Sequence, residues 1–326
     1  MKPVDFVEPE SVAGVIEALG DGARLIAGGS DLIGEMKEGT AQPSRLVSLA
    51  GVESLRQIEA FEGGLRIGAL ITIHALETGA ALTGPYLMLA EAARGVATPE
   101  IRHQGTLGGN LEQRPRCLHY RNALTPCLKK GGGGCPASES PYQNYLSIFG
   151  GPGCFAVHAS DLAPPLIALD AEVVIEGPAG SRRMPAASFF TGPDVDPTRE
   201  TVLAANEVIT HIALPAMPSG WRGLYTKSRE RTAGDFPIVS GAIGYDLVNG
   251  RASGVRIVLG GVAPTPLRMA EAEAVLEGQV PGEELAKRAA AVALSGATPL
   301  AYNGFKVDLT HALIWRGIMR LSTPYS

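Results

Sequence analysis

The sequence predicts an α+β protein, in which a βαβ-like unit and a larger mixed α/β segment precede a C-terminal domain with an antiparallel sheet and helices. Two observations support this class. Stretches with helical and with strand-like spacing of apolar residues alternate along the chain. Glycine (41 residues) and proline (24 residues) are abundant, which favours many turns and short strands over a helical bundle. The length of 326 residues suffices for two or three domains.

The βαβ-like unit is expected to occupy residues 1–54. Apolar residues recur at helical spacing near its start, and Gly20 ends that pattern. A short apolar strand then runs into a glycine turn, and a second helix and strand follow. The expected elements are a helix over 9–19, a strand over 23–27, a helix over 31–37 and a strand over 46–49.

The second segment is expected over 55–216. At its start the spacing of apolar residues changes from helical to strand-like. Alternating residues on both sides of Gly63-Gly64 predict a β-hairpin, and later apolar stretches predict helices, a second hairpin and a strand that Pro215 closes. Residues from about 112 to 155 form an insert, because they are rich in Gly, Pro, Arg and Lys and lack sustained periodicity. We expect a hairpin over 55–69, helices over 85–95 and 161–169, a hairpin over 172–184 and a strand over 208–214.

The third segment, expected over 217–326, begins with Met217-Pro218-Ser219-Gly220, which is typical of a linker. Strands come first and helices follow, so this segment is expected to form a separate α+β domain. The strands are expected near 222–228, 237–247 and 253–262, and the helices near 269–276, 282–294 and 307–320.

The composition argues against several classes of function. The net charge is −5 and the pI is about 5.8, which argues against a large nucleic-acid footprint. No window approaches 18 apolar residues, so no membrane span is expected. The N-terminus lacks the apolar core of an export signal, so no signal of the chain's own is expected. Neither G-x-G-x-x-G nor G-x-x-x-x-G-K-[ST] occurs, which leaves a nicotinamide Rossmann domain or a P-loop NTPase poorly supported.

Two glycine-rich turns are candidates for phosphate binding. Gly28-Gly29-Ser30-Asp31 lies between an expected strand and an expected helix, where glycine lets the backbone approach a phosphate closely. The alternative is that Ser30 or Asp31 simply caps the helix. Thr106-Leu107-Gly108-Gly109-Asn110 is the second turn, and its alternative is a tight bend with Asn110 in a left-handed conformation. The sequence permits both turns to hold one pyrophosphate.

All four cysteines of the chain lie in the insert: Cys117, Cys127, Cys135 and Cys154. Their C-x9-C-x7-C-x18-C spacing fits neither the short knuckles of structural zinc sites nor the compact ferredoxin pattern. From the residues alone, an iron–sulfur cluster and zinc are favoured about equally, with disulfides behind both. Four thiolates would complete the coordination of a four-iron cluster, and basic residues nearby would compensate its negative charge. These basic residues are Arg114, Arg116, Arg121, Lys129 and Lys130.

Several motifs, taken in order, resemble one protein family. Ala27-Gly28-Gly29-Ser30-Asp31-Leu32, Thr106-Leu107-Gly108-Gly109-Asn110, Ser160-Asp161-Leu162 and the stretch from Lys227 to Ser240 are similar to the FAD-binding medium subunit of the molybdenum hydroxylases. That family includes xanthine dehydrogenase, carbon monoxide dehydrogenase and 4-hydroxybenzoyl-CoA reductase. The resemblance covers essentially the whole chain. Most members lack the cysteine insert. It resembles that of the reductase and, more closely through Arg114-x-Arg116-Cys117-x-x-Tyr120-Arg121, that of the bacterial periplasmic-type aldehyde oxidoreductases.

The resemblance implies a two-part FAD-binding domain followed by the C-terminal α+β domain. It implies that the two glycine turns clasp the FAD pyrophosphate, that Asp161 contacts a hydroxyl or the ribose, and that Lys227 lies near the isoalloxazine. A helix cap for Asp161 and a surface position for Lys227 are the alternatives. In the related branches the cysteines bind a [4Fe–4S] cluster, and His119 and His158 are expected only to support it. The implied FAD residues are Ile26, Ala27, Gly28, Gly29, Ser30, Asp31, Leu32, Thr106, Gly108, Gly109, Asn110, Ser160, Asp161 and Lys227.

The implied function is that of the FAD and [4Fe–4S] electron-transfer subunit of a heterotrimeric, molybdenum-containing aldehyde oxidoreductase. A large subunit with the molybdenum cofactor would oxidise the aldehyde, and a small subunit would carry two [2Fe–2S] clusters. This chain would pass electrons through FAD to an external acceptor, and none of its residues is expected to be catalytic toward the aldehyde. Related aldehyde oxidoreductases are exported folded with a signal-bearing partner, so the expected location is the periplasm by co-export, or the cytoplasm.

The sequence leaves three alternatives open. The chain could serve another molybdenum hydroxylase, such as one similar to 4-hydroxybenzoyl-CoA reductase. It could be a stand-alone flavoprotein dehydrogenase, which would need acid–base groups near the flavin. It could also be a scaffold protein that zinc holds together, and such a protein would contain neither flavin nor iron.

Overall fold

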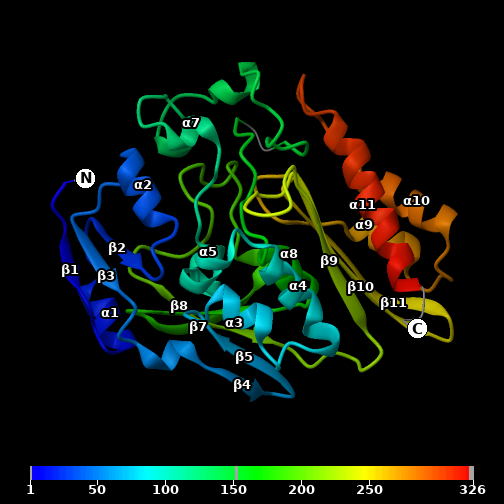
Figure 1. Ribbon diagram of the computed structural model, residues 1–326, viewed down its shortest axis with the longest axis horizontal. Coiled ribbons are helices and arrows are strands. Elements are labelled where there is room, and N and C mark those ends of the chain that lie inside the picture. Colours follow the sequence, from blue (N-terminus) through cyan, green and yellow to red (C-terminus); the bar gives the residue numbers. More distant parts are fainter. Residues whose placement is uncertain (1, 151–152, 323–326) are drawn as a thin grey trace.

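The computed structural model describes residues 2–150 and 153–322, and Figure 1 shows their arrangement. Met1, residues 323–326, and Gly151 and Pro152 of the predicted insert lie outside the described residues. Three sheets organise the described chain, one in each predicted segment. None of the helices in these described ranges combines the length and the apolarity that a membrane crossing requires.

The N-terminal sheet has three parallel strands in the order β1-β3-β2. Parallel neighbours need crossover connections, and a helix lies between each pair of successive strands. The Ser11 hydroxyl caps the first of these helices by accepting a hydrogen bond from the Gly14 amide at 3.1 Å. The predicted βαβ-like unit is confirmed, whereas the short β1 was not predicted. The elements are β1 (Asp5–Val7), α1 (Val12–Ala18), β2 (Ala23–Ile26), α2 (Leu32–Glu38) and β3 (Arg45–Ser48).

The second sheet has five antiparallel strands in the order β4-β5-β8-β6-β7. Its buried residues Ile67 and Ile212 share one core with Leu107 and Leu166 of the helices that lie above the sheet in Figure 1. Both predicted hairpins are present. The elements are β4 (Ile58–Phe61), β5 (Gly64–Gly68), α3 (Ile73–Thr78), α4 (Leu87–Gly95), α5 (Pro99–Gln104), α6 (Leu107–Leu111), α8 (Ala163–Ala168), β6 (Glu172–Gly177), β7 (Gly180–Pro185) and β8 (Val208–Leu214).

The C-terminal sheet has four antiparallel strands in the order β12-β11-β10-β9, and α9 and α11 pack on it. Ile243, Ile257 and Ile314 are fully buried in this core. The helices α4 and α8 of the second segment contact the same sheet, which joins the two segments. The predicted α+β fold class is confirmed. The elements are β9 (Arg222–Ser228), β10 (Val239–Val248), β11 (Arg251–Gly260), β12 (Leu267–Arg268), α9 (Ala270–Leu276), α10 (Glu283–Ala293) and α11 (Phe305–Ser322).

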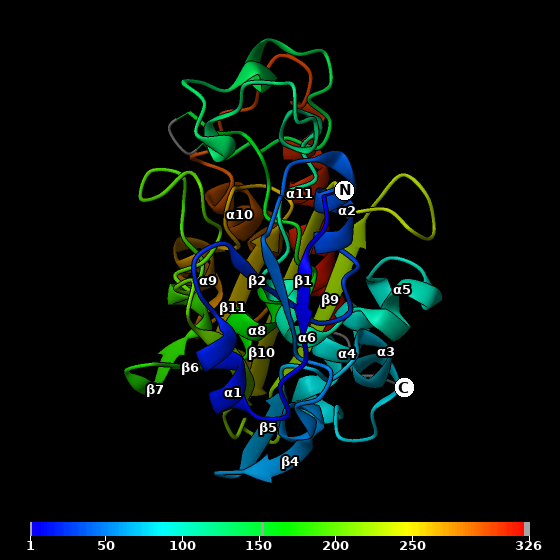
Figure 2. The same ribbon diagram turned by 90° about the vertical axis from the view of Figure 1, so that its left-hand side faces the viewer.

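The predicted insert has little regular structure. It contains α7 (Leu118–Arg121) and short 3-10 turns at Leu128–Lys130 and Pro136–Glu139. Figures 1 and 2 show this part of the chain at one end of the molecule, beyond α2 and near the start of α11. The Lys306 ammonium of α11 donates to the Leu146 carbonyl oxygen at 2.8 Å, and this bond ties the insert to the C-terminal domain.

Candidate functional site

A cavity of about 710 Å³ lies where the three segments of the chain meet. The tract from β2 into α2, the α5–α6 region, the loop over 198–207 and residues 234–236 of the C-terminal domain line it. Of the residues predicted to bind FAD, all line this cavity except Gly108, Ser160 and Lys227. The structure therefore gathers most of the predicted set around one space.

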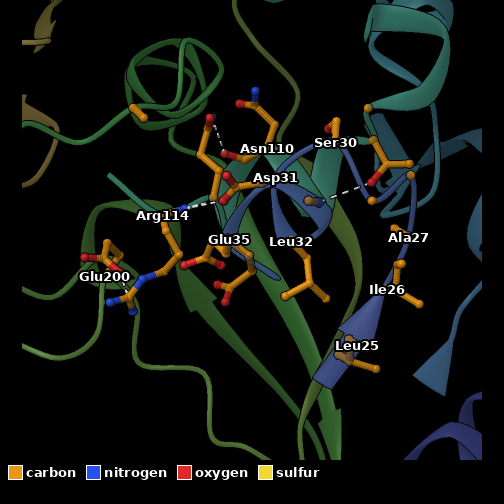
Figure 3. A pocket seen from close by; sticks show the side chains of 18 of the residues that line it. Leu25, Ile26, Ala27, Ser30, Asp31, Leu32, Glu35, Asn110, Arg114 and Glu200 are labelled. Carbon is orange, nitrogen blue, oxygen red and sulfur yellow. Dashed lines mark hydrogen bonds and ion pairs between the residues drawn. The ribbon is translucent and has the colours of Figure 1, made fainter. Parts of the chain in front are cut away.

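The turn between β2 and α2 allows two stretches of backbone to touch. A β-carbon on Gly28 would lie 1.7 Å from the carbonyl oxygen of Gln104, so only glycine fits there. Gly29 has a φ of +69°, in the left-handed region that favours glycine. The contact at Gly28 brings the first turn against the chain that leads into the second turn. Figure 3 shows Ala27 and Ser30 of the first turn on the cavity wall.

The Asp31 carboxylate does not cap α2, so the capping alternative is wrong for this residue. It accepts hydrogen bonds from the Arg114 backbone amide at 2.7 Å and from the Arg121 guanidinium at 2.6 Å. The Arg116 guanidinium lies 2.9 Å from the same carboxylate. All three donors belong to the insert, so one carboxylate joins the insert to the first glycine turn.

The second turn is the start of a short helix. The Thr106 hydroxyl accepts a hydrogen bond from the Gly109 amide at 3.2 Å and caps α6. Asn110 lies inside this helix, so the alternative of a tight bend with a left-handed asparagine is wrong. The Asn110 side-chain oxygen accepts a hydrogen bond from the Ser160 hydroxyl at 2.6 Å. Gly108 lies behind the wall, where an added β-carbon would be 3.0 Å from the β-carbon of Ala69.

Ser160, and not Asp161, stabilises the start of α8, because its hydroxyl accepts a hydrogen bond from the Ala163 amide at 3.0 Å. Asp161 instead accepts from the Tyr225 hydroxyl at 2.5 Å and from the Lys227 ammonium at 2.8 Å. The Lys227 side chain is 5% exposed, so the surface alternative is wrong. Burial and the nearby Asp161 charge raise the pKa of Tyr225, which keeps that hydroxyl protonated. Asp161 thus lines the cavity, with its cationic partner behind it.

Among the described residues the four cysteines form no disulfide, and the sulfur atoms of Cys135 and Cys154 share a hydrogen bond. The hydrogen bond with Cys154 lowers the pKa of Cys135 to about 5. Burial raises the pKa of Cys117, and the neighbouring thiols of Cys135 and Cys127 act in the same direction. Within the described ranges, no three Cys, His, Asp or Glu side chains converge as a ligand set for one metal ion. The Cys135–Cys154 hydrogen bond, together with the interactions of Cys117 with Cys135 and Cys127, links all four thiols into one group.

A buried chain of charges links the insert to the cavity wall. The Lys129 ammonium lies 2.6 Å from one Glu200 oxygen, and the Arg114 guanidinium lies 2.7 Å from the other, as Figure 3 shows for Arg114. The Arg114 guanidinium also donates to the Tyr120 hydroxyl at 2.9 Å, which donates to Glu35 at 2.5 Å. Sequence reasoning missed Glu35 and Glu200 as site residues. The one available signal was the basic excess of the insert, which requires acidic partners elsewhere in the chain.

Comparison with known proteins identifies the family of the chain. Residues 2–217 match the family described as the FAD binding domain in molybdopterin dehydrogenase, and residues 224–321 match the CO dehydrogenase flavoprotein C-terminal domain. The aldehyde oxidoreductase FAD-binding subunit PaoB of Escherichia coli (strain K12) is 35% identical over 294 residues, which cover 88% of this chain and 88% of that protein. The carbon monoxide dehydrogenase medium chain of Hydrogenophaga pseudoflava is 29% identical over 298 residues, or 90% of this chain and 87% of that protein.

Solved structures share the fold. Carbon monoxide dehydrogenase from Hydrogenophaga pseudoflava, in a form that lacks the Mo-pyranopterin moiety of its cofactor, matches with a TM-score of 0.78 and 28% identity over 98% of this chain and 96% of that chain. Quinoline 2-oxidoreductase from Pseudomonas putida 86 matches with a TM-score of 0.76 and 25% identity over 98% and 97%. Sequence families, relatives and folds agree over nearly the whole chain. The chain therefore belongs to the FAD-binding medium subunits of the molybdenum hydroxylase family.

Proposed function

We propose that this chain is the electron-transfer subunit of a heterotrimeric, molybdenum-containing aldehyde oxidoreductase, and that it binds both FAD and a [4Fe–4S] cluster. Its place in the family and its 35% identity to an aldehyde oxidoreductase FAD-binding subunit support the proposal. In this assignment a large partner subunit with the molybdenum cofactor oxidises the aldehyde, and a small partner subunit delivers electrons from its [2Fe–2S] clusters. Bound FAD exchanges electrons singly or in pairs, which suits a junction between clusters and an external acceptor.

The cavity between the two glycine turns is the proposed FAD site. The backbone contact at Gly28 holds the turns against one another, which suits a pyrophosphate clasped from both sides. Asp161 and Phe236 line the part of the cavity toward the C-terminal domain, whereas Arg24 and Leu25 line the part along β2, which Figure 1 shows on the other side of the molecule. We assign the isoalloxazine to the first end, in front of the buried ion pair of Asp161, and the adenosine to the second.

The observation that carries the proposal of a cluster-bearing subunit is the gathering of all four cysteines in one insert, which also lines this cavity. Four thiolates complete the ligand set of a [4Fe–4S] cluster. The thiols also interact with one another, which supports a single site that uses all four. Backbone amides of His119 and Tyr120 hydrogen-bond to the Cys117 sulfur, as is typical of a sulfur that carries charge.

The chain's own residues bind and position the proposed cofactors, and none is assigned a step on the aldehyde. Asp31 fixes the first turn to the insert through three donors. Tyr225 and Lys227 hold one oxygen each of the Asp161 carboxylate, so this group is fixed in position at the cavity wall. The substrate chemistry accordingly belongs to the partner subunit with the molybdenum cofactor.

A visible spectrum of the purified full-length chain, combined with iron and acid-labile sulfide analysis, tests the cofactor assignment. We expect a flavin band, broad iron–sulfur absorption and about four iron atoms per chain. Cys135→Ser should lose iron and sulfide, whereas Leu124→Ser, at a 93% exposed position of the same insert, should retain them. Zinc without sulfide would refute the cluster, and the absence of flavin would refute the FAD site.

The aldehyde assignment is tested on the complex assembled with its partner subunits. We expect oxidation of aromatic or aliphatic aldehydes with an artificial electron acceptor. A complex that oxidises no aldehyde but turns over another class of substrate would overturn the aldehyde part of the proposal. Such a result would leave the FAD and cluster assignments standing, because they rest on separate measurements.

A further inference from the structure

One carboxyl group on the cavity wall has no role in the proposed function. Glu112 directly follows α6, and its amide donates to the Gly108 carbonyl oxygen at 3.1 Å, which fixes its backbone beside the cavity that it lines. Its Oε1 atom is buried and has no hydrogen-bond partner among the described residues. Native structures rarely leave a buried carboxyl oxygen unpaired, so a ligand atom is the expected partner.

The surroundings of Glu112 favour its neutral form. Burial raises the pKa of Glu112 to about 7, and the Glu200 carboxylate acts in the same direction. A hydrogen bond with Thr201 and the guanidinium groups of Arg24 and Arg114 oppose this rise. The Arg114 guanidinium is itself paired with Glu200 at 2.7 Å, which limits its effect on Glu112. A pyrophosphate at the neighbouring turns would add negative charge and favour the protonated acid further.

Glu112 lies at the end of the cavity assigned to adenosine. Its partner Thr201 and the nearby Arg24 of β2 both line that end. A neutral carboxyl group offers one donor and one acceptor side by side. The amino group and a ring nitrogen of adenine present the complementary pair, and each ribose hydroxyl can both donate and accept. FMN and riboflavin lack the adenosine and offer no such partner at this end.

We propose that Glu112 recognises the adenosine half of FAD through hydrogen bonds of its carboxyl group and thereby makes flavin affinity depend on pH. This inference rests on the proposed FAD site. The bound complex retains the proton, whereas free protein loses it as the pH rises through about 7. FAD affinity is then constant below about pH 7 and falls by up to about tenfold per pH unit above it, because binding must take up a proton there.

The test titrates the flavin-free full-length protein with FAD, FMN and ADP from about pH 6 to about pH 9. Flavin binding is followed by fluorescence, and ADP binding by displacement of FAD. Glu112→Leu should weaken FAD and ADP by about tenfold at the low pH and leave FMN unchanged. Glu112→Gln keeps a donor and an acceptor, so it should bind FAD at low pH as tightly as the wild type. Its FAD affinity should not fall as the pH rises, because the amide does not titrate. Glu284→Gln, at a 93% exposed position, should behave like the wild type.

The results separate the role of Glu112 from the FAD site itself. Unchanged FAD and ADP affinity in Glu112→Leu, or a parallel loss of FMN, would overturn the inference and leave the FAD site intact. A pH decline that persists in Glu112→Gln would place the titrating group elsewhere and would also overturn it. Wild-type protein that binds no FAD would overturn the proposed site together with the inference. Because Glu112→Gln is nearly isosteric, its result stands even if Glu112→Leu does not fold.

Discussion

The joint between the insert and the first glycine turn can be tested at Arg121. Its side chain is 10% exposed and donates to Asp31 at 2.6 Å and to the Pro115 carbonyl oxygen at 2.8 Å. It also lies 3.4 Å from Glu38 at the end of α2. Replacing Arg121 with Met keeps most of the apolar stem and removes the charge and all of these donors.

The expected loss of stability depends on the hydrogen-bond donors that Asp31 keeps after the substitution. Removing one partner of a buried ion pair costs about 3–5 kcal/mol. Asp31 keeps the Arg114 amide and the Arg116 guanidinium, so we expect Arg121→Met to lower the free energy of unfolding by about 2 kcal/mol. At about 2 °C per kcal/mol for a large chain, the Tm should fall by roughly 4 °C. Because the turn loses part of its anchor, FAD affinity should fall by about tenfold.

Thermal unfolding and FAD titration of the purified chain measure these two effects separately. The matched control is Arg256→Met, which removes a guanidinium 2.6 Å from Asp170, away from the cavity. This control should lower the Tm and leave FAD affinity unchanged. If Arg121→Met lowered the Tm but bound FAD as tightly as the wild type, the insert would not hold the turn, and the reasoning would be refuted.

Three further changes test other parts of the structure. Gly28→Ala should abolish flavin binding, because its β-carbon would lie 1.7 Å from a carbonyl oxygen, whereas Gly133→Ala meets nothing within 4 Å and should keep full flavin content. Glu200→Gln removes the negative charge opposite the buried Lys129 ammonium and should lower the unfolding free energy in urea by about 3 kcal/mol. A change below about 1 kcal/mol would contradict a buried ion pair. Burial lowers the pKa of Lys306 to about 7, whereas lysine in an unfolded chain titrates near about 10.4. Between these values the unfolded state binds more protons, so stability should rise with pH by up to about 1.4 kcal/mol per unit, and Lys306→Met should flatten that rise.

The parts of the fold that were predictable are those long enough to show a period. The ten-residue strands β10 and β11 and the helices α10 and α11 lie within two residues of their predicted bounds. The helices α3, α5 and α6 were missed because each has six residues or fewer, which is under two turns, whereas the equally short α8 was predicted from its nearly continuous apolar sequence. These helices are placed by their packing over the second sheet, and the local spacing of apolar residues does not reveal that packing.

The same limit applies to the site. The sequence pointed to both glycine turns, but it could not separate a capping role from a binding role, because both use the same side-chain oxygens. Only the folded chain shows that Ser160 meets the Ala163 amide while Asp161 pairs with Lys227. Glu112 and Glu200 gain their significance from partners far along the chain, such as the lysine 71 residues before Glu200. Residue type and spacing do not show which residues that are distant in the sequence come into contact.

The basic residues of the insert have a different main role from the one that their position beside the cysteines indicates. In the sequence they are expected to compensate the charge of a cluster. In the structure Arg116 and Arg121 pair with Asp31, and Arg114 and Lys129 pair with Glu200. Each of these carboxylates lies outside the insert. A cation that is already paired contributes a weaker net field to its surroundings than a free one.

The groups that reach the sulfur atoms are mostly backbone amides. Those of Ala137 and Phe155 hydrogen-bond to Cys135, and that of Ala156 to Cys154, although Lys129 also favours the charged form of Cys154. The backbone of the insert therefore hydrogen-bonds to the thiols, whereas its arginines attach the insert to the residues around the FAD-binding cavity. Replacing an arginine of the insert should therefore weaken flavin binding more than it changes the reduction potential of a bound cluster. Replacing a cysteine should instead affect the cluster more than flavin binding.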